Sequence, residues 1–122
     1  MNEDFLAVNR EFLTLVSTVV NLIVRGEYET AEALTRSRRL SAGELEDAVQ
    51  RYGRHLVSPP QDTWNKLHVI PVKRRWRKKR EYTVVVPMWT QEEGASDLTL
   101  ELRVKEASQG LYDAEVLDLH VL

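Results

Sequence analysis

The chain has 122 residues, a formal net charge of −2, 43% hydrophobic and 30% charged residues, and no cysteine. This length fits one domain with its own core, and the composition excludes an intrinsically disordered chain. The lack of cysteine excludes disulfides and thiolate chemistry, and no apolar run is long enough to cross a membrane. Because residues 1–4 include two acids where a signal peptide would be basic, we expect a soluble, cytoplasmic protein.

Apolar residues at spacings of three and four predict a long amphipathic helix over residues 3–25, with a glycine stop directly after it. A short helix is expected over residues 28–35. A third helix should begin after Ser41, because Ser41 and Glu44 have the spacing of a capping box, and it should end at Gly53.

The helical part is expected to end at Ser58-Pro59-Pro60, since proline interrupts helices. Beyond this point the apolar period changes to two, which is typical of strands. Strands are predicted over residues 67–75, 82–89, 98–105 and 111–121. Residues 91–96 should form the hairpin loop between the second and third strands.

Two irregularities are expected in these strands. Pro87 lacks the amide that a central ladder needs, so it should lie at an edge or a bulge. In the last strand the apolar parity changes, which predicts a bulge near Glu115 or Val116. The whole pattern predicts a single α+β domain over residues 1–122, with three helices (1–57) on one face of a curved antiparallel sheet of about four strands (64–122).

A basic run is the most distinctive motif, since seven of the eight residues from Lys73 to Arg80 are Lys or Arg. The other 114 residues carry 10 basic and 19 acidic groups, so one positive pole lies on an acidic body. Predicted strands precede and follow the run, which puts its centre at or near a hairpin tip. The candidate partner-binding residues of this run are Arg74, Arg75, Trp76, Arg77, Lys78 and Lys79.

Three interpretations of the basic run stay open. It can meet an acidic patch on a protein, or it can bind phosphates with a base stacked on Trp76. It can also be a solvated hairpin without function, whose like charges discourage edge-to-edge aggregation. The single aromatic residue and the negative remainder argue against a general RNA-binding protein.

The histidines offer one candidate pair, because Asp118 and His120 lie two apart on the last predicted strand and therefore face the same side. They can act as a base and its orienting group, or they can be a half-buried histidine bonded to an acid. Glu115 should face the opposite side unless the bulge turns it. The spacing of His55 and His68 matches no zinc motif, so no metal is expected.

The predicted hairpin loop is acidic, and its candidate residues are Trp89, Glu92 and Glu93. Carboxylates at this spacing can hold a hard cation or meet a basic partner, or they can simply make the loop soluble. Trp89 at a strand end is typical of an interface anchor. Nucleotide-binding glycine motifs and a nucleophile elbow are missing from the sequence, so we expect neither a cofactor nor catalysis.

Two stretches of the chain resemble a small bacterial domain family of unknown function. The first runs from Leu22-Ile23-Val24-Arg25-Gly26-Glu27-Tyr28-Glu29 to Arg51-Tyr52-Gly53-Arg54, and the second from Met88-Trp89-Thr90 to Asp97-Leu98-Thr99-Leu100, with Asp118-Leu119-His120-Val121-Leu122 at the end. The predicted layout is also similar to the nuclear-transport-factor-2-like (cystatin-like) cone. That superfamily contains enzymes and ligand binders with a pocket in the cone, and also non-catalytic immunity proteins that neutralise bacterial toxins. The usual Asp/His/Tyr arrangement at the cone's floor is not evident here, which argues against an enzyme.

We therefore expect a non-catalytic protein-binding module, an immunity-type inhibitor that blocks the active site of a toxin. Its contact surface would combine the basic hairpin with Trp89 and the acidic loop. The alternative is a small-molecule or catalytic pocket between the first helix and the sheet, with Tyr52, Asp118 and His120 as polar members. Nucleic-acid binding through the basic run is the third hypothesis, and a homodimer through the outer sheet face also stays open.

Overall fold

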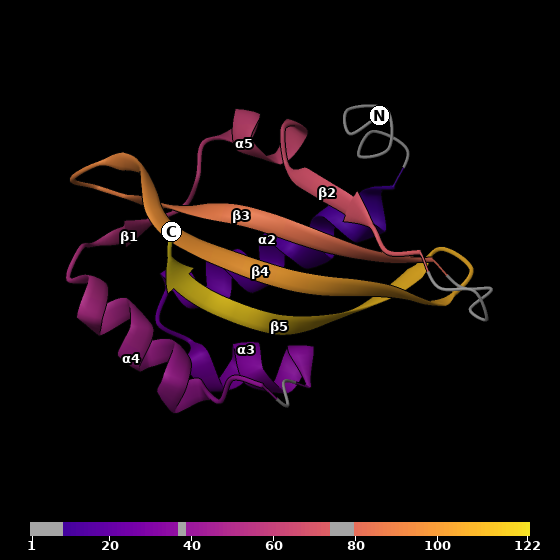
Figure 1. Ribbon diagram of the computed structural model, residues 1–122, viewed down its shortest axis with the longest axis horizontal. Coiled ribbons are helices and arrows are strands. Elements are labelled where there is room, and N and C mark those ends of the chain that lie inside the picture. The colour runs from indigo at the N-terminus through magenta and orange to yellow at the C-terminus, as the bar shows by residue number, and fades with distance from the viewer. Residues whose placement is uncertain (1–8, 37–38, 74–79) are drawn as a thin grey trace.

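The computed structural model describes residues 9–36, 39–73 and 80–122 (Figure 1). The first residues of the long predicted helix (3–8) lie outside the described residues. So do the candidate residues Arg74 to Lys79 of the basic run, of which only Lys73 and Arg80 are described.

Three helices lie among the described residues of the N-terminal half. They are α2 (Arg10–Val24), α3 (Tyr28–Thr35) and α4 (Ala42–Tyr52). The first begins at Arg10, because Asn9 has the non-helical backbone of an N-cap (φ −107°, ψ 68°), so the predicted helix over residues 3–25 is not continuous through residue 9. The capping box of α4 is confirmed, because the Glu44 amide donates to Ser41 Oγ at 3.2 Å and the Ser41 amide donates to Glu44 Oε1 at 3.1 Å. Gly53 ends α4 with a left-handed φ of 73°, a conformation that glycine adopts without strain.

The prediction that Ser58–Pro60 ends the helical part is wrong. Helix α5 (Gln61–Asn65) begins directly after Pro60, and a two-residue strand β1 (Leu56–Val57) precedes the prolines. Pro60 occupies the N-cap of α5, where its missing amide costs no helical hydrogen bond. Its carbonyl accepts a hydrogen bond from the Thr63 amide at 2.9 Å, which closes the first turn.

The remaining strands are β2 (His68–Pro71), β3 (Glu81–Thr90), β4 (Gly94–Ser108) and β5 (Leu111–Val121). They form an antiparallel sheet in the order β1-β3-β4-β5, and β2 also pairs with β3. The described sheet therefore has five strands, one more than predicted. The additional strand is β1, which was not predicted because two residues are too few to show an apolar pattern. The α+β class is confirmed.

Both predicted irregularities are present. The β3–β4 register shifts between Pro87 and Trp89, and Pro87 lies between the segments of β3 that pair with β2 and with β1. The bulge of β5 lies at Leu117, one residue beyond the predicted position, because the register passes from Val116 directly to Asp118.

Helices α2, α3 and α4 cover one face of the sheet. We call the other face the uncovered face, because among the described helices only the short α5 lies against it, at the β3 edge. Helix α2 runs behind the strands in Figure 1, and α3 and α4 lie along β5. Alternate residues of β3 point into the resulting core, and Val84, Val86 and Met88 are fully buried there. Within the described ranges, no helix combines the length and the apolar character that a membrane span needs.

Candidate partner-binding face

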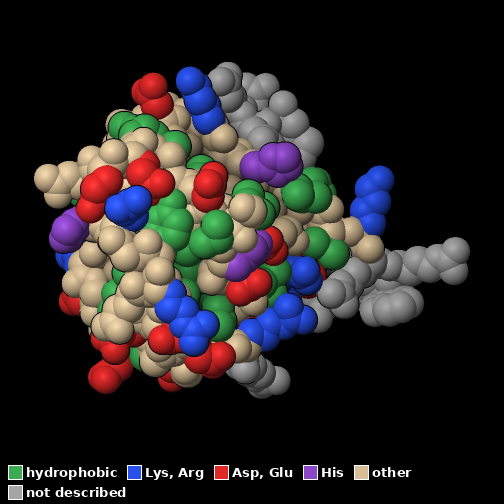
Figure 2. Space-filling model, turned by 60° about the vertical axis from the view of Figure 1, so that its left-hand side comes forward, with side chains coloured by type: hydrophobic (Ala, Val, Ile, Leu, Met, Phe, Trp, Pro, Cys, Tyr) green, Lys and Arg blue, Asp and Glu red, His purple; other side chains and the backbone are tan. Residues whose placement is uncertain are grey.

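The uncovered face is made by the other alternate residues of β3, β4 and β5. We define it by Thr83, Val85, Pro87 and Trp89 of β3, Thr99, Glu101, Arg103 and Lys105 of β4, and Asp113, Glu115, Asp118 and His120 of β5. Most of these side chains are half-buried or exposed, whereas their neighbours on the other face are buried. Figure 2 shows hydrophobic side chains at the surface beside acidic ones and a histidine. This face therefore mixes apolar and charged groups.

An apolar groove of about 300 Å³ lies on the uncovered face between β3 and α5. We call it the Trp89 groove; its lining residues are Asp62, Thr63, Lys66, Leu67, His68, Val85, Pro87 and Trp89. Trp89 lies at the end of β3, where its ring packs against Gly94 of the hairpin: a Cβ on Gly94 would lie 3.4 Å from Trp89 Cζ3. The candidate Trp89 therefore faces a hollow that another molecule can enter.

Beside the groove, His120 lies between two carboxylates. Its Nδ1 is 3.1 Å from Asp118 Oδ2, and its Nε2 is 3.6 Å from Glu101 Oε1 on the neighbouring strand. The predicted common side of Asp118 and His120 is confirmed. Because the bulge changes the parity of β5, Glu115 lies opposite Arg103 and joins the same face.

Arg103 is neutralised within the chain. Its Nη1 donates to Glu81 Oε2 at 2.8 Å, and the Glu81 side chain is only 2% exposed. Lys105 lies opposite Asp113 in the β4–β5 register. The excess charge on the described part of this face therefore comes from Glu101, Glu115 and Asp118.

Glu92 of the acidic hairpin loop is used inside the molecule. It accepts hydrogen bonds from His55 Nδ1 at 2.7 Å and from the His55 amide at 3.0 Å. The bond from the His55 ring, followed by the bond from its backbone amide, lowers the pKa of the Glu92 carboxyl.

Glu93 has a similar role. Its carboxylate accepts hydrogen bonds from the hydroxyls of Tyr52 at 2.8 Å and Thr90 at 3.1 Å. Desolvation of the Tyr52 phenol, and then its bond to Glu93, raises the pKa of Tyr52. Glu93 thus connects the β3–β4 hairpin to the last residue of α4, and Glu92 connects it to the loop after α4. The paired residues are 41 and 37 positions apart in the sequence, so no local pattern could predict these bonds.

Tyr52 and His120 meet at a second hollow, of about 330 Å³, between α4 and the end of β5. Its lining residues are Ala48, Arg51, Tyr52, Leu98, Leu119, His120 and Val121. At the place predicted for a pocket, between the first helix and the sheet, α2 packs on the strands, and Val16 and Val19 are fully buried. Asp118 does not line the second hollow.

Among the described residues, no group of three or more His, Asp or Glu side chains is placed to hold a metal ion.

A family model described as a domain of unknown function (DUF7668) matches residues 20–122. This match includes every residue of the uncovered face and of the Trp89 groove. Comparison with curated proteins and with solved structures finds no match.

Proposed function

The chain belongs to the DUF7668 family of domains of unknown function, and we propose that it is a non-catalytic protein-binding module whose contact surface is the uncovered face. One observation carries this proposal: apolar residues of β3 (Val85, Pro87 and Trp89) lie half-exposed around a groove, on a face where the short α5 at the rim of this groove is the only described helix. A solvated face of an antiparallel sheet normally carries polar residues, so an apolar row there indicates a binding surface.

The arrangement has the anatomy of a protein interface. Tryptophan in a hollow is a frequent hot spot, and polar groups commonly surround such an anchor. Here Trp89 supplies the anchor at the hairpin end of the groove. Glu101 and Asp118 lie level with Val85 at the other end of the apolar row, and His120 lies level with Pro87. Since Glu92 and Glu93 are bonded within the chain, we do not place the contact surface on the acidic loop.

We further propose that the partner is a bacterial toxin domain in the cytoplasm, and that binding blocks its active site. The resemblance to families that include immunity proteins supports this role. So does the charge asymmetry, because a basic run on an acidic body can accelerate association with a partner of complementary charge.

Affinity capture tests the binding function. The tagged chain is mixed with lysate of its own cell and with the product of the adjacent gene, and captured proteins are identified by mass spectrometry at moderate salt. We expect one stoichiometric partner for the wild type and at least about tenfold weaker binding for Trp89→Ser, the effect of losing a hot spot.

The control is Leu34→Ser, because Leu34 is 42% exposed on α3, away from the uncovered face. It should bind like the wild type. Equal capture by the Trp89 variant would remove the uncovered face as the contact surface, and no protein partner at all would remove the binding function.

A small-molecule site at the second hollow is the alternative function. Its apolar floor (Leu98 and Leu119) and its polar groups (Tyr52 and His120) are typical of ligand sites, and its volume of about 330 Å³ is sufficient for a small ligand. A panel of small molecules should then raise the Tm of the wild type but not that of Ala48→Trp, in which the new side chain fills the hollow. If no compound raises the Tm, this alternative fails.

A further inference from the structure

We propose that the uncovered face selects a partner segment in which an apolar side chain neighbours a basic one. The apolar side chain fills the Trp89 groove, and the Lys or Arg meets the carboxylates of Glu101 and Asp118. This inference rests on the proposed binding function and specifies the chemistry of the partner at the same face.

The register of the sheet puts the groove and the carboxylates next to each other. Val85, which lines the groove, lies opposite Glu101, and Glu101 lies opposite Asp118. Neighbouring strands are about 4.8 Å apart, so the two acidic residues lie about 5 and 10 Å from the groove wall along the sheet. In an extended partner, residues i and i+2 point to the same side about 7 Å apart, which matches this step.

Among the described contacts, neither Glu101 nor Asp118 forms an ion pair with a Lys or Arg side chain. Arg103 is paired with the buried Glu81, so its charge is already compensated. Asp118 accepts a hydrogen bond from the Leu119 amide at 2.9 Å, and the described side chain beside both Glu101 and Asp118 is His120, which is charged only when protonated. A permanent cation from a partner therefore gains favourable electrostatic energy here, and an acidic residue is repelled.

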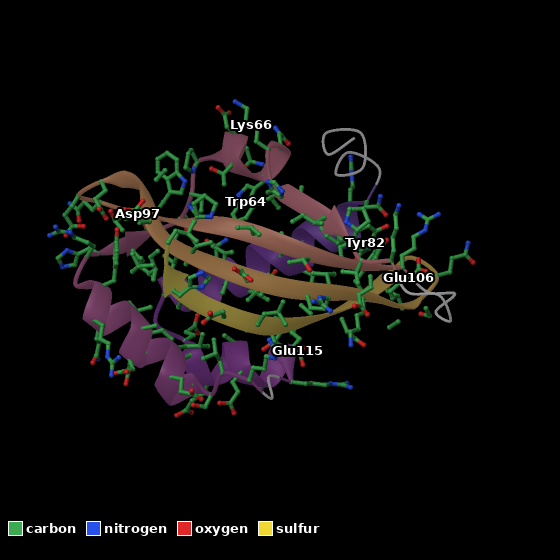
Figure 3. The ribbon with its side chains drawn as sticks, in the orientation of Figure 1. Trp64, Lys66, Tyr82, Asp97, Glu106 and Glu115 are labelled. Carbon is green, nitrogen blue, oxygen red and sulfur yellow. The ribbon has the colours of Figure 1, made fainter. Side chains whose placement is uncertain are left out.

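Excess negative charge lies on the β5 side of the face, whereas the α5 side of the groove carries both Asp62 and Lys66. Figure 3 shows Lys66 on α5 and Glu115 at β5, toward the opposite edge of the sheet. A basic residue that follows the apolar anchor should thus lie toward β5, where the unbalanced carboxylates are.

Peptide titration monitored by ¹H–¹⁵N NMR tests this selectivity. The probe is acetyl-Ser-Leu-Ser-Lys-Ser-amide, and the matched peptides replace Lys by Glu, or Leu by Ser. We expect the first peptide to shift the Trp89 indole signal and the amides of Glu101 and Asp118. Its affinity should exceed that of the Glu peptide by about fivefold, as one partly screened ion pair provides, and the advantage should fall at high salt.

The variant Glu101→Gln/Asp118→Asn should remove the preference for Lys and keep the contribution of Leu. Glu46→Gln/Asp47→Asn is the control with the same charge change, since both acids are exposed on α4. Equal affinity for the Lys and Glu peptides, or shifts confined to another surface, would overturn the proposed partner chemistry. If a protein is nevertheless captured through Trp89, the binding function stands and only the chemistry is wrong.

Self-association provides the second check. Sedimentation should show a monomer whose Trp89 signal does not change with concentration. A dimer that buries Trp89 would replace the foreign segment by a second copy of the chain and overturn the proposal.

Discussion

Phe12 links α2 to β3 and β5, the two strands that flank β4, at one end of the sheet. Its ring packs edge-to-face against Tyr82 of β3, with centroids 5.5 Å apart, and against Tyr112 of β5, at 5.4 Å. The side chain is fully buried, so its contacts combine burial with aromatic geometry.

The variant Phe12→Ala should therefore lower the free energy of unfolding by about 3–5 kcal/mol, because it removes apolar contacts and leaves a cavity. Urea denaturation followed by circular dichroism measures this change. Leu34→Ala, at an exposed position of α3, should cost less than about 1 kcal/mol. Equal losses in both variants would show that α2 does not pack as described.

Glu92 makes stability depend on pH in a defined direction. Its pKa is lowered from the ordinary value of 4.5 by hydrogen bonds from His55. A carboxyl with a lowered folded-state pKa stabilises the protein above its unfolded pKa and loses this contribution as the pH falls through the folded value. The stability difference between the wild type and Glu92→Gln should thus be present above about pH 4.5 and shrink below it.

Urea titrations of both proteins from pH 3 to pH 7 test this dependence. Glu46→Gln, which removes an exposed carboxylate of α4, is the control for the loss of one surface charge. A wild-type advantage that grows on acidification would contradict the bonding between Glu92 and His55.

The β3–β4 hairpin determines how Trp89 is presented at the groove. Gly94 has a φ of 75°, and a Cβ there would lie 3.4 Å from the Trp89 ring. Gly110, in the β4–β5 turn, has almost the same φ of 76°, but a Cβ there would meet nothing within 4 Å. Comparing alanine substitutions at the two glycines therefore distinguishes the effect of backbone strain from the effect of contact with the Trp89 ring.

Both Gly94→Ala and Gly110→Ala should lose about 1–2 kcal/mol of stability from left-handed strain. Only Gly94→Ala should also shift the NMR signal of the Trp89 indole, because its methyl group would lie in van der Waals contact with the ring. If Gly110→Ala shifts that signal equally, the Gly94 contact does not position Trp89.

Elements with strong local signals were predictable from sequence. The helix of residues 28–35 and the limits of the third helix follow from apolar periodicity, the capping box at Ser41 and the glycine at position 53. By contrast, β1 and α5 contain two and five residues, too few for a periodic pattern, and tertiary contacts decide their structure.

The same division holds for the site. The common side of Asp118 and His120 follows from strand parity, which is local. The approach of Glu101 to His120, the pairing of Arg103 with Glu81 and the bond between Tyr52 and Glu93 all depend on register between distant segments. Such contacts require the fold itself.

At the scale of the whole molecule, the charge separation predicts association kinetics. Reversing Arg75, Arg77 and Lys79 to Glu should slow association with the partner and make its rate less sensitive to salt, because attraction by the basic run is lost. Stopped-flow mixing at several salt concentrations measures this effect once a partner is captured.

The matched control reverses three basic residues outside the run, Arg10, Arg39 and Arg54, with the same change in net charge. Its association rate should be affected less. If both triple variants slow association equally, net charge rather than the basic run determines the rate.

The extra residue at Leu117 has a consequence for how this domain can vary in length. Because Leu117 is the extra residue of the bulge, deleting it would give a regular strand in which Ala114 and Val116 stay inside and Asp118 and His120 stay outside. Single-residue changes in length should therefore be tolerated at position 117 and in the turn at Gln109–Gly110, whereas elsewhere in β5 they should occur only in pairs. Gaps in an alignment of relatives should follow this distribution.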